Sequence, residues 1–473
     1  MQHLKSDKLK NKTVENIGFT VLGAGRSGSG IAKLLKKRGA RVFLSESSPA
    51  ENLLYFDPED IKSCNIDYET GGNSDRVYKS DYIIASPGIP YKADILEKAR
   101  AKGIKVISEI EAASWFCNSP VIAITGTNGK TTTTVLTGEL LKNAGYDVKV
   151  CGNVGLAFSE VINELNSNSV VVLEVSSFQL ETIDCFKPHV SLLLNLSSDH
   201  IDWHGTFDNY VNAKFKINKN QDKYDYVIYN SDDSNLKIKS HLFNGRKCAF
   251  GFSESSEELI ENEDLEMRCF VNGNGDIIYE KNNIKEVITN RNEILIKGSH
   301  NVYNSMASIL AVKIYNVTAN IIMKTLKEFP GVEHRIEPVR EINGVKYYND
   351  SKATNYDSLS VALESFPGNI VLIMGGKISP FQGVNDFASV DILIKERVKI
   401  ILAIGQSKED IKKYFGKFTD VVLFETLEEA VNAAGKFAIK DDTVLFSPGY
   451  KSFDMFSNFE HRGSEFKKFV NKI

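Results

Sequence analysis

The chain lacks the features of a secreted or membrane-spanning protein. Its 473 residues include only six cysteines with no CxxC pair among them, which argues against a zinc site or a disulfide framework and favours reduced thiols. No uninterrupted apolar run reaches the roughly 18 residues of a membrane span, and the lysine-rich start has no apolar segment of the signal-peptide kind. We therefore expect a cytoplasmic protein with no membrane partner.

A basic excess is also missing. Lysine and arginine number 57 against 61 for aspartate and glutamate, so the formal net charge is −4. Because a nucleic-acid-binding protein needs clustered positive charge, nucleic acid is not expected as a partner. A small anionic ligand needs only a local pocket and remains compatible. At about 100–200 residues per domain, the length suggests about three domains.

One segment combines an apolar strand, a glycine-bearing turn and the start of a helix: VIAITGTNGKTTTTVLTGELLKNAG, residues 121–145. Gly126 and Gly129 allow backbone N–H groups to point at a phosphate, and the positive end of the helix faces it. Lys130 would place charge near the β- and γ-phosphates, and Thr131 is positioned to bind Mg²⁺. Isoleucine replaces the first glycine of GxxxxGK[ST], so a generic kinase or GTPase loop fits imperfectly. The narrower TGTNGKT predicts ATP binding.

A second glycine turn lies near the start of the chain. Gly23, Gly25 and Gly28 follow an apolar strand, and Glu46 ends the next strand about twenty positions on. This βαβ pattern is typical of dinucleotide sites, but the same turn holds other phosphates, so NAD is one alternative. A further strand ends in a tight turn at residues 86–88, where open parallel sheets place ligands.

Downstream segments predict two more strand–helix alternations. Central strands are expected at residues 147–151, 170–175 and 190–194, each buried on both faces. NGNG at residues 272–275 predicts a hairpin. Strands reading IVLIMGG, IILAIG and TVLFSPG follow a proline- and glycine-marked boundary near residue 330.

The chain is therefore predicted to be an α/β protein of three domains. An N-terminal Rossmann-like domain would span residues 1–109, and a central P-loop ATPase-like domain with a mostly parallel sheet would span 110–331. A C-terminal Rossmann-like domain would span 332–473. Three such domains in series imply a site assembled in the clefts between them.

Three side chains of the central domain are candidates for metal binding or catalysis. Glu174 ends an apolar strand, where burying a carboxylate is costly unless a cation such as Mg²⁺ compensates; a salt bridge or cap is the alternative. His200 leaves the next strand with Asp199 and Asp202, either as a ligand or as a hydrogen-bonded core residue. Lys214 lies on the apolar side of a helix, where the sequence alone favours a surface lysine whose stem covers that face.

Polar residues near the third domain suit a nucleotide. Asn301 and Asn304 lie one helical turn apart, suited to an adenine edge and equally to helix capping. Arg335, next to His334, could neutralise phosphate charge, and Asp350 could bind a ribose or a metal. A contribution to the ATP site from another domain implies closure before reaction.

These motifs together resemble one family over nearly the whole chain. TGTNGKT, LEVSSFQLE, NLSSDHIDWHG, GSHNVYNSMAS, EHRIE and NDSKATN are similar to segments of the Mur ligases, the ATP-dependent amino-acid ligases of peptidoglycan synthesis. ASPGIP, SFQLE and the closing SPGYKSFDMFSNFEHRGSEF are most similar to the members that use D-glutamate. The resemblance implies a monomeric ligase that joins D-glutamate to UDP-N-acetylmuramoyl-L-alanine through an acyl phosphate, using ATP and two Mg²⁺ ions.

The resemblance also assigns residues to ligands. The ATP site that it implies comprises Gly126, Thr127, Asn128, Gly129, Lys130, Thr131, Thr132, Asn301, Asn304, Arg335 and Asp350. The UDP-substrate site that it implies comprises Arg26, Ser27, Glu46, Ser86, Gly88, Asn153 and Gln179. The D-glutamate pocket that it implies comprises Thr354, Ser452 and Phe459.

The metal ligands and catalytic residues follow from the same resemblance. It implies that Thr131 and Glu174 bind a first Mg²⁺, and that His200 and Lys214 bind a second, the lysine as a carbamate formed with CO₂. Lys130, His200 and Lys214 would be the catalytic residues. Because only a neutral amine forms a carbamate, Lys214 should be partly desolvated.

One departure from the family leaves the amino-acid site open. The family often carries a lysine after the segment IVLIMGG that pairs with a D-glutamate carboxylate, whereas here Lys377 follows the glycines directly. Either Lys377 or Lys451 could supply this charge. Three rival functions remain: a Mur-type or folylpolyglutamate-type ligase with another acceptor, a non-catalytic UDP-sugar and ATP sensor, and an NAD oxidoreductase.

Overall fold

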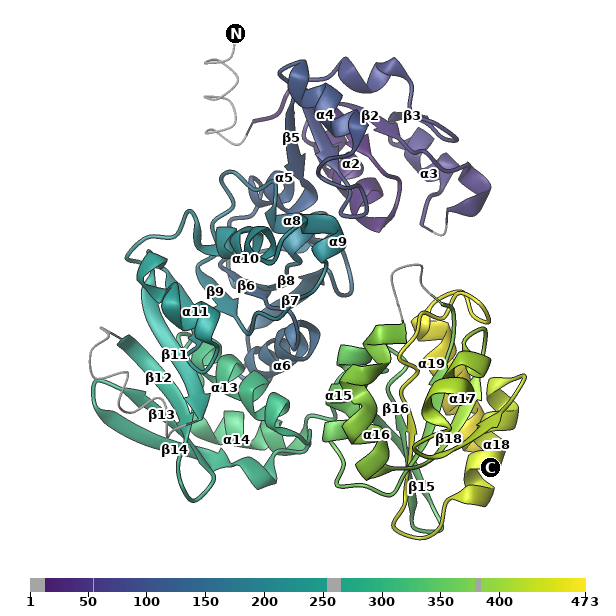
Figure 1. Ribbon diagram of the computed structural model, residues 1–473. Helices are drawn as coiled ribbons and strands as arrows, with labels where there is room; N and C mark the ends of the chain where they lie inside the picture. Colours follow the sequence, from purple (N-terminus) through teal and green to yellow (C-terminus); the bar gives the residue numbers. More distant parts are fainter. Residues whose placement is uncertain (1–12, 54, 253–264, 379–383) are drawn as a thin grey trace. The chain divides into compact units, whose positions relative to one another are not determined.

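The computed structural model describes residues 13–53, 55–252, 265–378 and 384–473 (Figure 1). The chain divides into two compact units, one of residues 1–293 with 303–327 and the other of residues 294–302 with 328–473. Part of the lysine-rich start and part of the segment after Lys377 lie outside the described residues. None of the helices in the described ranges is long and apolar enough to span a membrane.

The first sheet has five parallel strands in the order β3-β2-β1-β4-β5. Its strands are β1 (Gly18–Leu22), β2 (Arg41–Ser45), β3 (Asp67–Glu69), β4 (Tyr82–Ala85) and β5 (Lys105–Ser108). Its helices are α2 (Arg26–Lys37), α3 (Pro58–Ser63), α4 (Asp94–Ala101) and α5 (Glu109–Ser114). Every residue of β1 is buried, and α2 buries Ile31 and Leu35 toward the core. The predicted Rossmann-like arrangement is confirmed.

The second sheet has nine strands in the order β14-β13-β12-β11-β10-β9-β6-β8-β7. Its strands are β6 (Val121–Thr125), β7 (Asp147–Gly152), β8 (Ser169–Glu174), β9 (Val190–Leu193), β10 (Tyr226–Asn230), β11 (Arg246–Phe252), β12 (Leu265–Val271), β13 (Asp276–Lys281) and β14 (Ile284–Asn290). The helices that follow these strands are α6 (Lys130–Asn143), α7 (Phe158–Val161), α8 (Ser177–Leu180), α9 (Ile201–His204), α10 (Phe207–Phe215), α11 (Ser234–Ile238), α13 (Ser299–Lys313) and α14 (Ala319–Glu328).

Two sequence predictions about this sheet are confirmed and one is wrong. The antiparallel pair β12–β13 turns at the predicted NGNG, and β8 and β9 are buried throughout. β7 was expected to be buried on both faces, yet most of its residues are only half-buried. The reason is its place at the end of the sheet together with the charged Asp147 and Lys149, which alternate with its apolar residues.

The third sheet has six strands in the order β15-β16-β20-β17-β18-β19, and all pairs except β15–β16 are parallel. Its strands are β15 (Glu337–Ile342), β16 (Val345–Asn349), β17 (Ile370–Gly375), β18 (Val398–Ile404), β19 (Asp420–Leu423) and β20 (Thr443–Phe446). Its helices are α15 (Tyr356–Glu364), α16 (Asp391–Arg397), α17 (Lys408–Phe415), α18 (Leu427–Phe437) and α19 (Phe459–Lys472).

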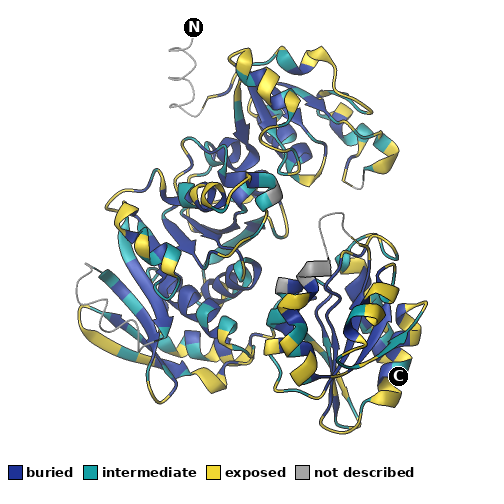
Figure 2. Cartoon of the chain, viewed as in Figure 1, coloured by how far each residue is buried: buried dark blue, intermediate teal, exposed yellow. Residues whose placement is uncertain are grey.

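Helices cover both faces of this third sheet. Helices α15, α16 and α17 pack on one face around Leu372 and Ile401, and α18 and α19 pack on the other around Val371 and Ile373. Buried residues accordingly follow the strands, whereas exposed residues gather on the outer sides of the helices (Figure 2). The three-domain α/β fold is confirmed, and the domain boundaries in the sequence stay predictions.

One buried carboxylate ties α5 to the segment before β9. Glu111 is 1% exposed and accepts hydrogen bonds from the backbone N–H groups of Asp184 (2.9 Å), Cys185 (3.0 Å) and Phe186 (2.9 Å). It also accepts one from the indole of Trp115 at 2.8 Å. Four donors depend on this single side chain.

Replacing Glu111 with alanine should lower the free energy of unfolding of the first unit by about 3 kcal/mol, because the four donors would stay buried without an acceptor. Both tryptophans of the chain, Trp115 and Trp203, belong to this unit, so urea unfolding followed by their fluorescence measures it selectively. Glu97→Ala on the exposed side of α4 is the control and should change stability by less than about 0.5 kcal/mol. Equal effects of the two substitutions would contradict the interpretation.

Candidate active site

The turn between β6 and α6 has the backbone of a phosphate loop. Gly126 has φ +158° and Gly129 has φ +81°, conformations that favour glycine. A Cβ atom at Gly129 would lie 2.3 Å from Oδ1 of Asn304, so the turn also has no room for a side chain there. Helix α6 begins directly after it at Lys130, so the positive end of the helix faces the turn.

Side chains from several segments hold this turn in place. The Lys130 ammonium donates to the carbonyl oxygens of Gly126 (2.9 Å) and Thr127 (2.7 Å). The amide of Asn195 accepts from the backbone N–H of Asn128 at 2.8 Å and donates to its carbonyl at 3.1 Å. The Thr127 hydroxyl lies 2.9 Å from the Tyr210 hydroxyl. Sequence reasoning missed Asn195 and Tyr210 because both act through contacts distant in the chain.

Thr131 and Thr132 lie on the first turn of α6, and both are buried. Thr133, one residue further, donates its hydroxyl hydrogen to Oδ1 of Asn304 at 3.2 Å. Asn304 on α13 is therefore part of the phosphate-loop surroundings. Asn301 on the same helix donates to the carbonyl of Lys297 at 2.8 Å, a contact at the start of the helix. Binding of an adenine by this pair stays a prediction.

Lys214 is a buried lysine beside the phosphate loop. It is 2% exposed, and its ammonium donates to the carbonyl of Gly126 at 2.8 Å. Burial lowers the pKa of Lys214 well below its usual value, and the charge of Lys130 lowers it further, whereas Asp199 and Glu174 oppose the shift. The expectation of a surface lysine is wrong, because α10 turns this side chain into the protein. The expected desolvation is confirmed.

Glu174 is a buried carboxylate at the end of β8. It is 2% exposed, and its Oε1 accepts a hydrogen bond from the amide of Asn153 at 2.9 Å. Its Oε2 is buried with no hydrogen-bond partner in the described part of the chain. An unsatisfied carboxylate oxygen is costly in the interior, and a hard divalent cation is the partner that it suits. Glu174 therefore suits a Mg²⁺ ligand, and its pairing with Thr131 in one ligand set stays a prediction.

His200 precedes α9 in a left-handed backbone conformation with φ 53°. Its side chain is 48% exposed, its Nε2 lies 3.5 Å from the Asp199 carboxylate, and its ring packs edge-on against Phe178. The alternative of a core histidine is wrong, since the ring is open to solvent. An exposed imidazole on a strained turn can accept a ligand, so the metal role of His200 stays a prediction.

The first-domain glycine turn is held by the residues that the sequence singled out. Glu46 accepts from the backbone N–H groups of Ala24 and Ser48, both at 2.8 Å. Burial raises the pKa of Glu46, but these hydrogen bonds outweigh it and the net pKa is lowered. A Cβ atom at Gly23 would lie 2.4 Å from the hydroxyl of Ser86. Glu46, Ser86 and the turn thus meet at the carboxyl ends of the adjacent strands β2, β4 and β1.

The other residues assigned to the UDP substrate come from elements of both the first and the second sheet. The Arg26 guanidinium contacts the carbonyl of Gly155, and Ser27 follows it on the first turn of α2. Gln179 is buried and uses its side-chain oxygen to accept from Ser176, which caps α8. Gly88 is exposed. A pocket beside these elements is lined by residues that include Ser86, Tyr91, Phe178, Gln179 and Trp203.

In the second compact unit, Asp350 is a buried carboxyl group directly after β16. Its two oxygens accept from the hydroxyl of Ser447 (2.7 Å) and the backbone N–H of Ile336 (3.2 Å). Burial raises the pKa of Asp350 to about 7, although Ser447 and Arg335 favour the charged form. The Nε of Arg335 is buried with no hydrogen-bond partner among the described residues. Both groups are suited to a polar ligand, and their assignment to ATP stays a prediction.

The residues assigned to D-glutamate follow β16 and β20. Ser452 is buried, and its carbonyl accepts from the N–H groups of Met455 and Phe456. Phe459 begins α19, and its carbonyl accepts from the Ser351 hydroxyl at 2.8 Å. Thr354 is half-buried just before α15.

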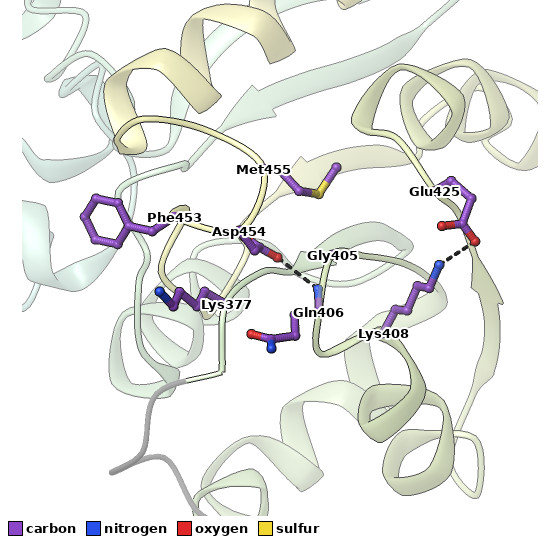
Figure 3. A pocket seen from close by; sticks show the side chains of 8 residues that line it. All are labelled: Lys377, Gly405, Gln406, Lys408, Glu425, Phe453, Asp454 and Met455. Carbon is purple, nitrogen blue, oxygen red and sulfur yellow. Dashed lines mark hydrogen bonds and ion pairs between the residues drawn. The ribbon is translucent and has the colours of Figure 1, made fainter.

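Lys377 and Lys451, which both remained candidates for the carboxylate-binding lysine, are backbone neighbours. The N–H of Lys377 donates to the carbonyl of Lys451 at 2.8 Å. Lys377 lines a pocket at the ends of β17 and β18, whereas the structure does not place Lys451 in its lining (Figure 3). The residues that line this pocket are Lys377, Gly405, Gln406, Lys408, Glu425, Phe453, Asp454 and Met455. The Lys408 ammonium is already paired with Glu425.

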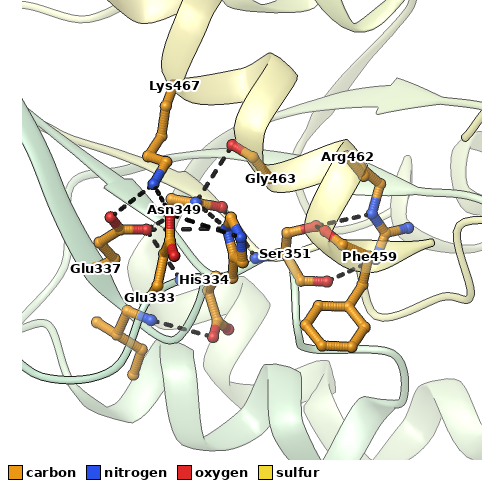
Figure 4. Close-up of polar contacts among 11 residues, drawn as sticks. Glu333, His334, Glu337, Asn349, Ser351, Phe459, Arg462, Gly463 and Lys467 are labelled. Atoms are coloured by element: carbon orange, nitrogen blue, oxygen red, sulfur yellow. Dashed lines mark hydrogen bonds and ion pairs between the residues drawn. The ribbon is translucent and has the colours of Figure 1, made fainter. Parts of the chain in front are cut away.

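A cluster around His334 has a structural role. Glu333, His334 and Glu337 bring their ligand atoms within 4.8 Å of one another, but the ammonium of Lys467 contacts both glutamates (Figure 4). His334 is buried, and its Nδ1 lies 2.9 Å from the amide of Asn349. Burial lowers the pKa of His334. The positive charge that pairs with the two glutamates of this cluster is therefore that of Lys467. Through these ion pairs the cluster joins the start of β15 to α19.

Sequence reasoning also missed Arg462, a fully buried arginine on α19. It stands in the closing motif, but no role was assigned to it. Helical spacing could have found it, since Arg462, Phe466 and Val470 recur every four residues and share the buried face of α19.

Comparison with known protein families covers all three sheets. Residues 18–108 match "Mur ligase MurD-like, N-terminal domain", residues 124–312 match "Mur ligase middle domain", and residues 334–449 match "Mur ligase, glutamate ligase domain". These three matches follow one another along the chain and cover most of the described residues.

Relatives of nearly equal length match almost the whole chain. The UDP-N-acetylmuramoylalanine–D-glutamate ligase of Chloroherpeton thalassium is 39% identical over 96% of this chain and 97% of its own length. The enzyme of the same name from Caldicellulosiruptor saccharolyticus is 40% identical over 96% and 98%.

Solved structures share the fold at lower identity. The pseudomurein peptide ligase type C of Methanothermus fervidus is 19% identical with a TM-score of 0.58, over 97% of this chain and all of that one. The UDP-N-acetylmuramate–alanine ligase of Thermotoga maritima is 18% identical with a TM-score of 0.57, over the same shares. With the phosphate loop, the buried Lys214 and Glu174, and relatives of nearly equal length, the chain belongs to the Mur ligase family.

Proposed function

We propose that this protein is an ATP-dependent ligase that joins D-glutamate to UDP-N-acetylmuramoyl-L-alanine in peptidoglycan precursor synthesis. The observation that carries the proposal is the pair of lysines at one phosphate-loop carbonyl, found in a chain whose full-length relatives bear the name of this ligase. The Lys130 ammonium at Gly126, with the buried Lys214 beside it and Glu174 close enough to influence Lys214, makes a site for highly charged phosphates and Mg²⁺.

ATP would bind with its phosphates at the turn of residues 126–129. The positive end of α6 and the Lys130 ammonium would face the β- and γ-phosphates. Thr131 and Glu174 would hold one Mg²⁺, and His200 with a carbamylated Lys214 would hold a second; bound Mg²⁺ supplies positive charge that neutralises the transferring phosphoryl group.

The reaction would proceed in two steps. A carboxylate oxygen of UDP-N-acetylmuramoyl-L-alanine attacks the γ-phosphorus of ATP, the bond to the β-phosphate oxygen breaks, and ADP leaves with the electron pair. The product of this first step is an acyl phosphate. The amine of D-glutamate then attacks its carbonyl carbon, loses a proton and expels phosphate to leave an amide. Lys130 would stabilise the charge that develops in the first step, and no side chain has to act as a nucleophile.

Burial of Lys214 supports the carbamate proposal. A lowered pKa leaves more of the amine neutral at physiological pH, and the neutral amine is the form that attacks CO₂. The product is an anionic oxygen ligand in place of a cation. Carbamylation would therefore remove the repulsion between Lys214 and Lys130 and add a ligand for Mg²⁺.

The UDP-substrate would bind along the first glycine turn, and D-glutamate would bind in the second unit. Arg26 and Ser27 at the start of α2 suit the diphosphate, and Glu46 suits a ribose or uracil donor. For D-glutamate, the pocket position of Lys377 favours it over Lys451 as the cation that pairs with a carboxylate. We expect the protein to act as a monomer in the cytoplasm.

Phosphate release with ATP, Mg²⁺ and UDP-N-acetylmuramoyl-L-alanine should occur with D-glutamate and not with L-glutamate, L-lysine or meso-diaminopimelate. In the same assay Lys130→Ala should lower kcat by about 10²–10³-fold, since it removes charge that stabilises phosphoryl transfer. Turnover with another amino acid would reassign the acceptor within the family. No turnover with any acceptor would favour a binding protein, and a fully active Lys130→Ala would contradict the mechanism.

Replacing Lys214 with alanine should abolish ligation, and a small added carboxylate such as acetate should restore part of it whereas bicarbonate should not. In the unsubstituted enzyme, removal of CO₂ near neutral pH should lower the activity, and added bicarbonate should restore it. The reason is that burial lowers the pKa of Lys214, so that more of the amine is neutral and able to react at this pH. Lys219→Ala, an exposed lysine nearby, is the control and should keep normal activity. A catalytically normal Lys214→Ala would exclude the carbamate.

Replacing Lys377 with alanine should raise KM for D-glutamate by about tenfold, the value of one charge-assisted hydrogen bond. Lys451→Ala is the matched comparison, since its side chain is exposed and outside the lining of the pocket. Steady-state kinetics with varied D-glutamate at saturating ATP would measure both. A larger effect from Lys451→Ala would reverse the assignment.

A further inference from the structure

Arg462 is the one arginine among the buried residues of the described chain. It is 1% exposed, and its side chain is the largest by volume among the fully buried side chains of the described residues. It lies on the inner face of α19 beside Gly463, Phe466 and Val470, a face that otherwise carries small or apolar residues. A guanidinium placed there loses its hydration, so it must be held by strong partners.

The partners of Arg462 are groups from two distant loops. Its Nε donates to the hydroxyl of Ser351 at 3.0 Å, and one Nη donates to the carbonyl of the same residue at 2.7 Å. Its other Nη donates to the carbonyl of Tyr450 at 3.0 Å. The Ser351 hydroxyl in turn donates a hydrogen bond to the carbonyl of Phe459 at the start of α19, so Arg462 is linked to Phe459 through Ser351 (Figure 4).

These loops follow three neighbouring strands of the third sheet. Ser351 comes just after β16 and Tyr450 after β20, and the two strands are adjacent and parallel. Gly376 comes just after β17, on the other side of β20, and a Cβ atom there would lie 3.2 Å from Nη1 of Arg462. One guanidinium therefore sits where three loops meet at the carboxyl ends of parallel strands, the edge at which such sheets bind ligands.

Arg462 is charged at neutral pH and yet closed to substrate. Burial lowers the pKa of Arg462 to about 10, whereas Asp454 and Asp350 favour its charged form. Its three hydrogen bonds go to protein groups, and its lack of exposure leaves no face for a ligand. Arg462 therefore acts as a structural link between the loops that carry Ser351 and Tyr450. The planar guanidinium with its fixed donors is better suited to this role than the ammonium group of a lysine.

The two ligand sites of this unit depend on Arg462 to different degrees. Asp350 precedes Ser351 and interacts electrostatically with Arg462, but it also has anchors independent of the guanidinium in the hydroxyl of Ser447 and the backbone N–H of Ile336. Ser452, in contrast, lies two residues from Tyr450, whose carbonyl Arg462 holds, and Phe459 is held through Ser351. Loss of the guanidinium should therefore displace the loops assigned to the amino acid more than the carboxylate assigned to the nucleotide.

We infer that Arg462 is a positioning residue for amino-acid binding, because its guanidinium joins Ser351 to Tyr450 and so sets the relative placement of the loops that carry Thr354, Ser452 and Phe459. The inference rests on the proposed function for the identity of the amino acid. The connection between the loops does not depend on that identity.

Arg397 provides a matched control within the same unit. It also donates to three backbone carbonyls, those of Leu363, Glu364 and Phe366. It ends α16 just before β18, and these carbonyls precede β17, so its contacts lie at the amino ends of the strands. Arg397→Lys thus removes a comparable set of hydrogen bonds far from the loops in question.

The experiment compares Arg462→Lys, Arg397→Lys and the unsubstituted protein by steady-state kinetics and by hydrogen–deuterium exchange. Arg462→Lys should raise KM for D-glutamate by about tenfold or more, since misplaced binding groups weaken binding steeply, and should change KM for ATP by less than about threefold. Amides of residues 450–458 should exchange faster in Arg462→Lys than in the unsubstituted protein. Arg397→Lys should leave both KM values and this exchange unchanged.

Several outcomes would overturn the inference. Unchanged exchange at residues 450–458 in Arg462→Lys would do so even without an activity assay, and so would equal effects of the two lysine variants on KM for D-glutamate. Should Arg462→Lys fail to fold, Ser351→Ala keeps the guanidinium and its hydrogen bonds to the carbonyls of Ser351 and Tyr450 but removes the hydroxyl that joins Nε of Arg462 to Phe459. A normal KM for D-glutamate in that variant would also contradict the inference. An unsubstituted protein that does not turn over would contradict the proposed function instead, while the exchange comparison would still decide the role of Arg462.

Discussion

The carbonyl oxygen of Gly126 accepts hydrogen bonds from two lysines, and much of the central site depends on this contact. Lys130 reaches it from the helix that follows, and Lys214 reaches it from α10, 88 residues along the chain. Two ammonium groups on one oxygen repel each other in a poorly hydrated interior. Burial, and after it the charge of Lys130, lowers the pKa of Lys214. Bound phosphates would offset the positive charge here, and a divalent cation would suit the buried, unsatisfied oxygen of Glu174.

The same arrangement of loops recurs in all three sheets. After β1, β6 and β20 the chain turns at the carboxyl end of a parallel strand, and side chains from neighbouring strand ends hold the turn. Glu46 and Ser86 do this in the first sheet and Asn195 in the second, whereas Lys214 in the second and Arg462 in the third act from helices packed beside the turn. Parallel strands make this possible because all of their carboxyl ends lie at one edge.

Local features of the fold were predictable from the sequence. Apolar strands, glycine turns and the NGNG hairpin are encoded by neighbouring residues, so their positions could be predicted to within a few residues. The partial burial of β7 was predicted wrongly, since Asp147 and Lys149 alternate with its apolar residues as in a half-buried strand, and the order of strands places it at an edge. Strand order depends on the packing of helices that are separated in the sequence.

For the candidate site, the sequence by itself determined which chemical groups are present: a phosphate loop with Lys130, a carboxylate at the end of β8, and motifs similar to those of one family. Only the tertiary structure decided which of them are buried and what they contact. Lys214 is a surface lysine by the rules of a single helix and becomes a desolvated amine because α10 packs against the turn at Gly126. Arg462 becomes a connector for the same reason, since hydrogen bonds to Ser351 and Tyr450 exist only once β16, β20 and α19 are assembled.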